Sequence, residues 1–126
     1  MKTIDIDKMA HGYINGALWV ECSHVGEFED DSFQDCGFDA GDLTAEAYYM
    51  VVDLCKDYLA KVGNLVDHAD MEDSDVGYNL YLTIAGHGAG FWDRGLGKIG
   101  EDLSDLCDGL PALRFFVTDE NKIEVE

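Results

Sequence analysis

The segment of this chain with the clearest chemical potential is a run of glycines interrupted by a histidine, Gly86-His87-Gly88-Ala89-Gly90. Glycine-rich loops cradle phosphates, but this one matches neither G-x-G-x-x-G nor the Walker pattern. It also resembles the His-Gly oxyanion loop of esterases, but the chain has no Gly-x-Ser-x-Gly nucleophile. We therefore predict a tight structural connection, with glycines at positive φ, aromatic side chains in the core, and Asp93 and Arg94 pairing or capping. The residues of this predicted motif are Gly86, His87, Gly88, Gly90, Phe91, Trp92, Asp93 and Arg94.

The residues that could bind a metal ion or act as nucleophiles do not form a recognisable sequence motif. Cys22, His24 and Cys36, with His11, could meet at a zinc ion, but their spacing is not that of a known zinc finger. Residues 35–46 have the length of an EF-hand loop, but the third and sixth positions are Gly and Ala. Carboxylate pairs and Cys–His pairs are too numerous to indicate a catalytic site. We predict no metal, no cofactor and no catalytic residue.

The distribution of acidic residues is more informative. No Lys or Arg lies between Lys8 and Lys56, while ten acidic residues do. A surface of closely spaced carboxylates approximates a nucleic-acid strand, so a basic groove built for DNA or RNA would attract it. Solubility alone is the other explanation of such a surface. The predicted partner-binding residues are Glu27, Glu29, Asp30, Asp31, Asp35, Asp39, Asp42, Glu46, Asp53 and Asp57.

Three of these carboxylates share one face of a predicted helix. Glu46, Asp53 and Asp57 fall within roughly 40° of one another on a helical wheel. At the helical rise they are about 10 and 6 Å apart along the axis. Glu101, Asp105 and Asp108 form a similar stripe on another predicted helix. Exposed aromatic residues such as Trp19 or Phe28 could anchor the centre of an interface.

Composition sets the class of protein. The chain has 126 residues, a formal net charge of −19, 47% hydrophobic residues and 14 aromatic residues (2 Trp, 6 Tyr and 6 Phe), which is typical of a folded domain rather than an acidic tail. We predict a single acidic domain over residues 1–126. The charge argues against direct binding of nucleic acid or an anionic membrane surface. The chain shows neither a membrane-length apolar run nor a signal peptide, and four widely spaced cysteines suggest reduced cytosolic thiols.

Periodicity and turn residues predict the elements that position these groups. Helices are expected over residues 7–22, 44–62 and 95–108, the second between a Thr44 N-cap and a Gly63 C-cap. Gly12 and Gly16 either weaken the first helix or let another element pack closely. Strands are expected over residues 78–84, 112–117 and 122–125, the last two as a hairpin, and acidic loops over 23–43 and 67–76. The predicted fold class is α+β, with three helices and a small, largely antiparallel three-stranded sheet.

Two segments, YINGALW from Tyr13 to Trp19 and GHGAGFWDRGLG from Gly86 to Gly97, are separated by an acidic loop. The arrangement resembles a family of small acidic bacteriophage-encoded proteins, in order over most of the chain. The chain departs from the family pattern at Cys22 and over residues 110–117. The resemblance implies an accessory protein made in the cytoplasm of an infected bacterium, where such proteins bind host nucleic-acid enzymes, including restriction and CRISPR complexes. It assigns no catalytic residue.

Together these observations predict a non-enzymatic inhibitor that acts as a nucleic-acid mimic, either anti-CRISPR or anti-restriction. Its partner would be the basic groove of a host nucleic-acid-binding protein or complex, and its oligomeric state is left open. The alternative is a small enzyme or ligand-binding domain that uses the glycine-rich loop of His87 with Asp93 and Arg94. A regulatory phage protein with a neutral partner is a third class. A contiguous acidic face without a deep pocket would favour the inhibitor, and a pocket with His87 at its mouth would favour the enzyme.

Overall fold

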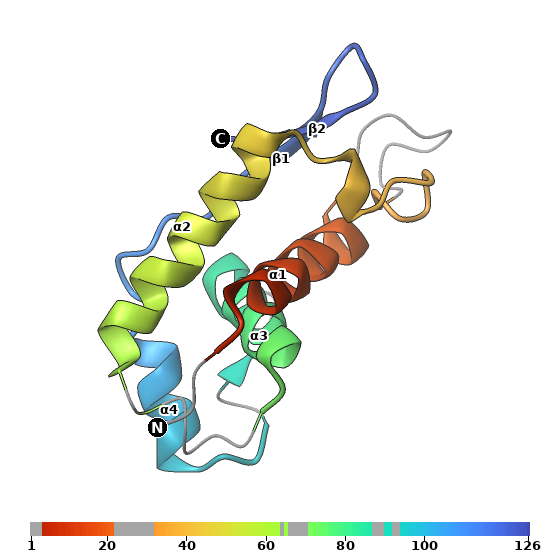
Figure 1. The fold of residues 1–126 in the computed structure, drawn as a ribbon. Coiled ribbons are helices and arrows are strands. Elements are labelled where there is room, and N and C mark those ends of the chain that lie inside the picture. The colour runs from red at the N-terminus through yellow and green to blue at the C-terminus, as the bar shows by residue number, and fades with distance from the viewer. Residues whose placement is uncertain (1–3, 22–31, 64, 66–70, 87–89, 92–93) are drawn as a thin grey trace.

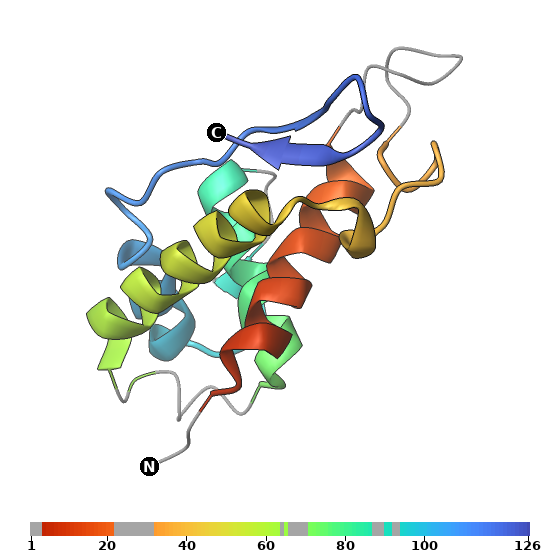
Figure 2. The same ribbon diagram turned by 45° about the horizontal axis from the view of Figure 1, so that its top comes forward.

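A computed structural model describes residues 4–21, 32–63, 65, 71–86, 90–91 and 94–126. The described elements are α1 (Ile6–Val20), the 3-10 helix η1 (Ala40–Asp42), α2 (Ala45–Val62), α3 (Asp73–Ala85), α4 (Lys98–Asp105), β1 (Phe115–Val117) and β2 (Ile123–Val125). In Figure 1, α1 and α3 cross beside each other, α2 runs along one side, and the strands and α4 lie at opposite ends. Figure 2 shows the same arrangement with α2 in front of α4.

The helix α2 confirms the prediction made from its caps and its periodicity. The Thr44 hydroxyl accepts a hydrogen bond from the Ala47 N–H at 3.2 Å, and Gly63 ends the helix at a φ of 55°. The buried face carries seven residues, from Ala47 to Val62, at helical spacing. The opposite face is exposed and carries the predicted acidic residues.

The predicted strand over residues 78–84 is wrong, because this segment lies inside α3. Residues 78–84 alternate in polarity, but the helix begins earlier, at Asp73, and its buried positions include Val76 and Leu80, four residues apart. A short apolar run does not by itself distinguish a strand from a buried helix. The end of the predicted 67–76 loop forms the first turn, where Asp73 and Asp75 interact favourably with the helix dipole.

The predicted three-stranded sheet is therefore also wrong, and the described part of the chain has four α-helices rather than three. The C-terminal hairpin is confirmed, although each strand has only three residues. Phe115 pairs with Val125 and Val117 with Ile123 in an antiparallel register. The hairpin is joined to the segment before α2 by a hydrogen bond from the Thr44 N–H to the Ile123 carbonyl, 3.0 Å long.

Two other helices differ from the predictions in length. The Asp5 carboxylate caps α1 by accepting from the N–H groups of Asp7 and Lys8 at 3.0 and 3.3 Å. The helix α4 is shorter than the predicted 95–108. Gly95 and Gly97 have positive φ and delay its start, and residues 106–109 form turns instead of a further helical turn.

Glycines set the distance between α1 and α3. A Cβ atom added to Gly77 would lie 1.8 Å from the Met9 carbonyl oxygen, and one added to Gly12 would lie 1.9 Å from the Ser74 carbonyl oxygen. The two backbones therefore pack against each other at positions where only glycine fits. Gly12 thus has the packing role considered for it, which compensates for its low helix propensity.

We expect Gly77→Ala to lower the free energy of unfolding by about 1–3 kcal/mol, because the new methyl group forces two backbones apart. Urea unfolding followed by circular dichroism would measure the change. Gly16→Ala is the control with the smaller expected loss of stability. The atoms nearest to its new Cβ are side-chain ring carbons of Tyr78 and Tyr81, at 3.0–3.3 Å, and not backbone atoms. A Gly77→Ala protein as stable as Gly16→Ala would show that α1 and α3 separate without penalty.

Candidate functional site

The exposed face of α2 brings together three of the predicted partner-binding residues. Glu46, Asp53 and Asp57 are all exposed there. Two large hydrophobic side chains lie on the same face, Tyr49 with 64% and Met50 with 38% of its surface exposed. We refer to these five residues as the α2 face. It combines carboxylates with an exposed aromatic ring and a flexible thioether, both of which are enriched in protein interfaces.

The carboxylates of the α2 face have no direct cationic partner among the described residues, although Lys56 and Lys61 are exposed on the same helix. Glu46, Asp53 and Asp57 make no hydrogen bond or ion pair with a described residue through their side chains. By contrast, the exposed Lys98 pairs with Asp102 and the Arg114 guanidinium pairs with Glu126. The α2 face therefore presents net negative charge that a cationic partner could neutralise.

The other predicted partner-binding residues fall into two groups. Glu27, Glu29, Asp30 and Asp31 lie outside the described residues, and so does Phe28. Asp35 is exposed within the turn over residues 33–37. Asp39 and Asp42 form a capping box around η1, in which the Asp39 carboxylate accepts from the Gly41 N–H at 2.8 Å and the Asp42 carboxylate from the Asp39 N–H at 2.9 Å. These two carboxylates stabilise a turn as well as adding charge.

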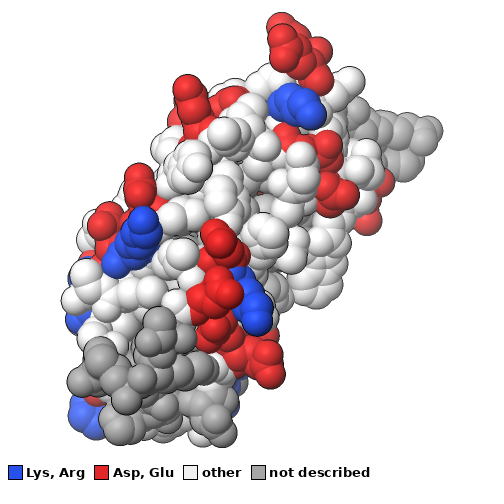
Figure 3. All heavy atoms as spheres, viewed as in Figure 1, with Lys and Arg blue, Asp and Glu red and all other residues white. Residues whose placement is uncertain are grey.

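Acidic side chains in Figure 3 form several separate groups with uncharged surface between them, and some of the groups adjoin a Lys or Arg. This view does not show one continuous acidic stripe. In the second predicted stripe, Glu101 and Asp105 lie on α4, whereas Asp108 follows its end. The α2 face is distinct because its carboxylates share one helix face with two exposed hydrophobic side chains.

Sequence reasoning missed Tyr49 and Met50 as site residues, although a signal for them exists. On a helical wheel both positions lie within about 60° of Asp53, on the side opposite the buried residues. Trp19, which was predicted to be an exposed anchor, is indeed 61% exposed, but it lies on α1.

The glycine-rich segment has the structural features predicted for its described residues. Gly86 ends α3 at a φ of 74°, and Gly90 has a φ of 147°. Phe91 is fully buried and stacks on the Tyr58 ring, with centroids 5.8 Å apart. The segment follows a helix rather than a strand, which removes the strand–loop–helix context of a phosphate loop. His87, Gly88, Trp92 and Asp93 lie outside the described residues.

Arg94 is tied back to α3. Its Nε–H donates to the Asn79 Oδ1 atom at 2.7 Å, and the Asn79 amide donates to the Asp75 carbonyl at 2.8 Å. Asn79 is only 2% exposed, so this contact satisfies a buried amide. The arrangement confirms that Arg94 pairs within the structure.

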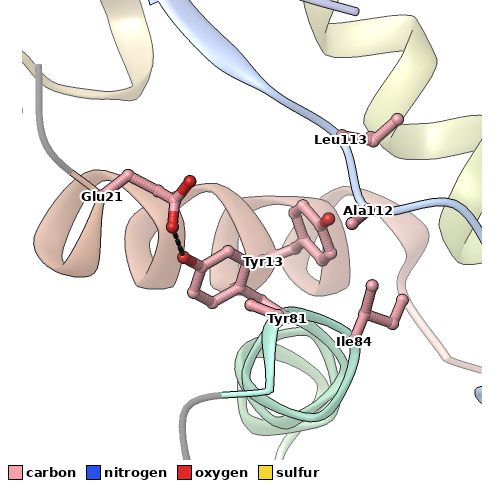
Figure 4. Close-up of a pocket in the computed structure, with 7 residues that line it drawn as sticks. Tyr13, Glu21, Tyr81, Ile84, Ala112 and Leu113 are labelled. Atoms are coloured by element: carbon pink, nitrogen blue, oxygen red, sulfur yellow. Dashed lines mark hydrogen bonds between the residues drawn. The ribbon is translucent and has the colours of Figure 1, made fainter.

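A pocket between α1, α3 and the segment before β1 contains two tyrosines and a glutamate that could act as catalytic groups. It measures about 190 Å³ and includes Tyr13 from α1, Tyr81 from α3, Glu21 and the 112–113 segment (Figure 4). The Tyr81 hydroxyl donates to Glu21 at 2.5 Å. Burial first, and then the Glu21 contact, raise the pKa of Tyr81, while burial raises the pKa of Tyr13. Both phenols therefore keep their protons at neutral pH and are poor general bases.

Two of the described thiols are likewise poor nucleophiles. Cys55 and Cys107 form no disulfide with a described residue, and burial raises the pKa of both to about 12. Among the described residues, no group of three or more His, Cys, Asp or Glu side chains could hold a metal ion. Cys22 and His24, considered as zinc ligands, lie outside the described residues.

Comparisons of the chain with protein-family models, with curated proteins and with solved structures gave no match. Within the described part of the chain, every helix is too short or too polar to span a lipid bilayer.

Proposed function

We propose that this protein is a non-enzymatic inhibitor that occupies the basic, nucleic-acid-binding groove of a host defence complex. The α2 face is part of its contact surface, and its carboxylates take positions that phosphates would otherwise occupy. The resemblance to acidic bacteriophage-encoded proteins suggests an anti-CRISPR or anti-restriction role in an infected bacterium. The protein binds the partner protein, and it binds neither nucleic acid nor a membrane.

The observation that carries this proposal is the set of three exposed carboxylates on the α2 face, none of which has a hydrogen-bond or ion-pair partner among the described residues. Their spacing of about 10 and 6 Å along the helix axis corresponds to roughly every third and every second phosphate of one strand, given about 3.4 Å per phosphate. Lysines and arginines arranged to follow a nucleic-acid strand could therefore meet more than one of them. Tyr49 and Met50 add apolar contact area, which supplies affinity that charge alone does not.

Net charge supports the same interpretation through association kinetics. A chain with a net charge of −19 is drawn towards a positively charged groove over distances of about a Debye length, roughly 10 Å at 0.1 M salt. Such steering raises association rates and falls steeply with ionic strength. The alternative is an enzyme or ligand site that uses His87 with Asp93 and Arg94. Of these three, the structure describes Arg94, which lines a pocket of about 210 Å³ together with Asp75, Tyr78 and Asn79. The Arg94 Nε–H is held there by Asn79, so this atom is engaged in the fold.

The test is capture from a nuclease-treated bacterial lysate, followed by identification of the bound proteins and competition. We expect nucleic-acid-binding defence subunits to be retained at low salt and released by added duplex DNA or RNA, because both ligands need the same groove. Raising the salt to about 1 M, where the Debye length is roughly 3 Å, should also release them. Captured proteins that resist both nucleic acid and salt would contradict the proposed function.

A further inference from the structure

A pocket of about 250 Å³ opens at the edge of the α2 face. Four of its lining residues come from α2 and two from the segment that connects α4 to β1, which Figure 1 shows running beside α2. The lining residues are Met50, Asp53, Leu54, Asp57, Pro111 and Leu113.

The pocket has apolar walls and an acidic edge. Leu54 is 4% exposed and belongs to the core, while Met50, Pro111 and Leu113 are more accessible. Asp53 and Asp57 are exposed and lie one helical turn apart, about 6 Å along the axis. Because neither carboxylate has a described partner, both are available to a group that enters between them.

We propose that this pocket receives an arginine side chain of the basic partner, an inference that rests on the proposed function. The methylene stem packs against Met50, Leu54 and Leu113, and the guanidinium lies against the carboxylates of Asp53 and Asp57. Arginine fits better than lysine because its guanidinium is planar, weakly hydrated and able to donate two parallel hydrogen bonds to a carboxylate. Lysine carries a compact and strongly hydrated charge that loses more on entering an apolar pocket.

Other occupants fit the pocket less well. Drug-sized ligands usually occupy about 300–1,000 Å³, so this pocket has the size for one side chain. Two carboxylates repel phosphates and other anions. A second copy of this chain would bring another net charge of −19. Charge and size therefore both favour a single cationic side chain.

The pocket can be tested without the partner by using N-acetyl-arginine amide as the probe. The probe would be titrated into protein that carries ¹³C-labelled methyl groups. The methyl signals of Met50, Leu54 and Leu113 would be followed by NMR. We expect saturable shifts at these three residues and binding at least about tenfold weaker in Asp53→Asn/Asp57→Asn. The matched control is Asp119→Asn/Glu120→Gln, which removes the same charge from the exposed turn between β1 and β2 and should leave the titration unchanged.

Two further probes separate this pocket from general attraction of cations to an acidic protein. N-acetyl-citrulline amide has nearly the same shape without the charge and should give no saturable shift. N-acetyl-lysine amide should bind several-fold more weakly than the arginine probe. Equal binding of all three probes, equal binding of arginine and lysine, or an undiminished titration in Asp53→Asn/Asp57→Asn would overturn the proposal.

Failure of the arginine pocket and failure of the proposed function would give different experimental results. If no probe binds but the captured partner is still displaced by DNA, the inhibitor role stands and the arginine pocket does not. If the arginine probe binds as expected but the captured proteins are not displaced by nucleic acid, the pocket stands and nucleic-acid mimicry does not.

Discussion

The Asp53→Lys/Asp57→Lys variant should bind the basic partner captured from lysate at least about 100-fold more weakly than the native protein. Close charge pairs across an electrostatically steered interface contribute at least about 1.5 kcal/mol each. Removing two such pairs costs about 3 kcal/mol, and reversal adds repulsion, so a 100-fold loss is a lower estimate. Affinity would be measured by surface plasmon resonance at two salt concentrations, with the larger loss expected at the lower salt.

The fold of this variant should be unchanged. Both positions are exposed on α2, and exposed substitutions generally change stability by less than about 0.5 kcal/mol. Lysine is also a better helix former than aspartate. The matched control is Asp119→Lys/Glu120→Lys, which makes the same change of charge in the turn of the hairpin. If both variants lose affinity equally, the effect comes from net charge alone. A folded Asp53→Lys/Asp57→Lys protein with native affinity at low salt would remove the α2 face from the interface.

Local sequence signals predicted the elements whose structure depends on local interactions. The helix α2 has a side-chain cap at Thr44, a glycine at its end and an apolar face at helical spacing, all readable from the sequence. The helix α3 lacks a side-chain cap, and Gly77 within it is required by the close approach of α1. Its conformation thus depends on a tertiary contact, which single-sequence periodicity does not contain.

In the candidate site, too, the helix face set by local sequence was predicted and the pocket set by tertiary contacts was not. The grouping of Glu46, Asp53 and Asp57 follows from helical geometry and was predicted. The pocket beside them was not, because Pro111 and Leu113 reach α2 from more than fifty positions further along the chain. The capping box of Asp39 and Asp42 was also missed, because their spacing was interpreted only as charge.

Phe91 lies where the glycine-rich segment meets α2 and α3, and its ring partner Tyr58 reaches α4. It stacks on Tyr58 of α2 with an interplanar angle of 16°, and the Tyr58 hydroxyl donates to the Leu103 carbonyl of α4 at 2.8 Å. The Phe91 N–H is also within 3.3 Å of the Thr83 hydroxyl on α3. Phe91 therefore holds the glycine-rich segment to α2 through its ring and to α3 through its N–H, which is a structural role for a segment whose sequence also suggested a catalytic loop.

Phe91→Ala should accordingly lower the free energy of unfolding by about 3–5 kcal/mol, the usual result of deleting a fully buried aromatic ring. This is a large fraction of the about 5–15 kcal/mol that stabilises a typical domain. Urea unfolding would measure it, and Phe91→Leu, which keeps most of the apolar volume, should lose less than about 1.5 kcal/mol. Because Phe91 is buried, the folded fraction of Phe91→Ala should still bind the partner with native affinity. A stable Phe91→Ala protein that has lost partner binding would instead assign the glycine-rich segment to function and favour a ligand site around His87.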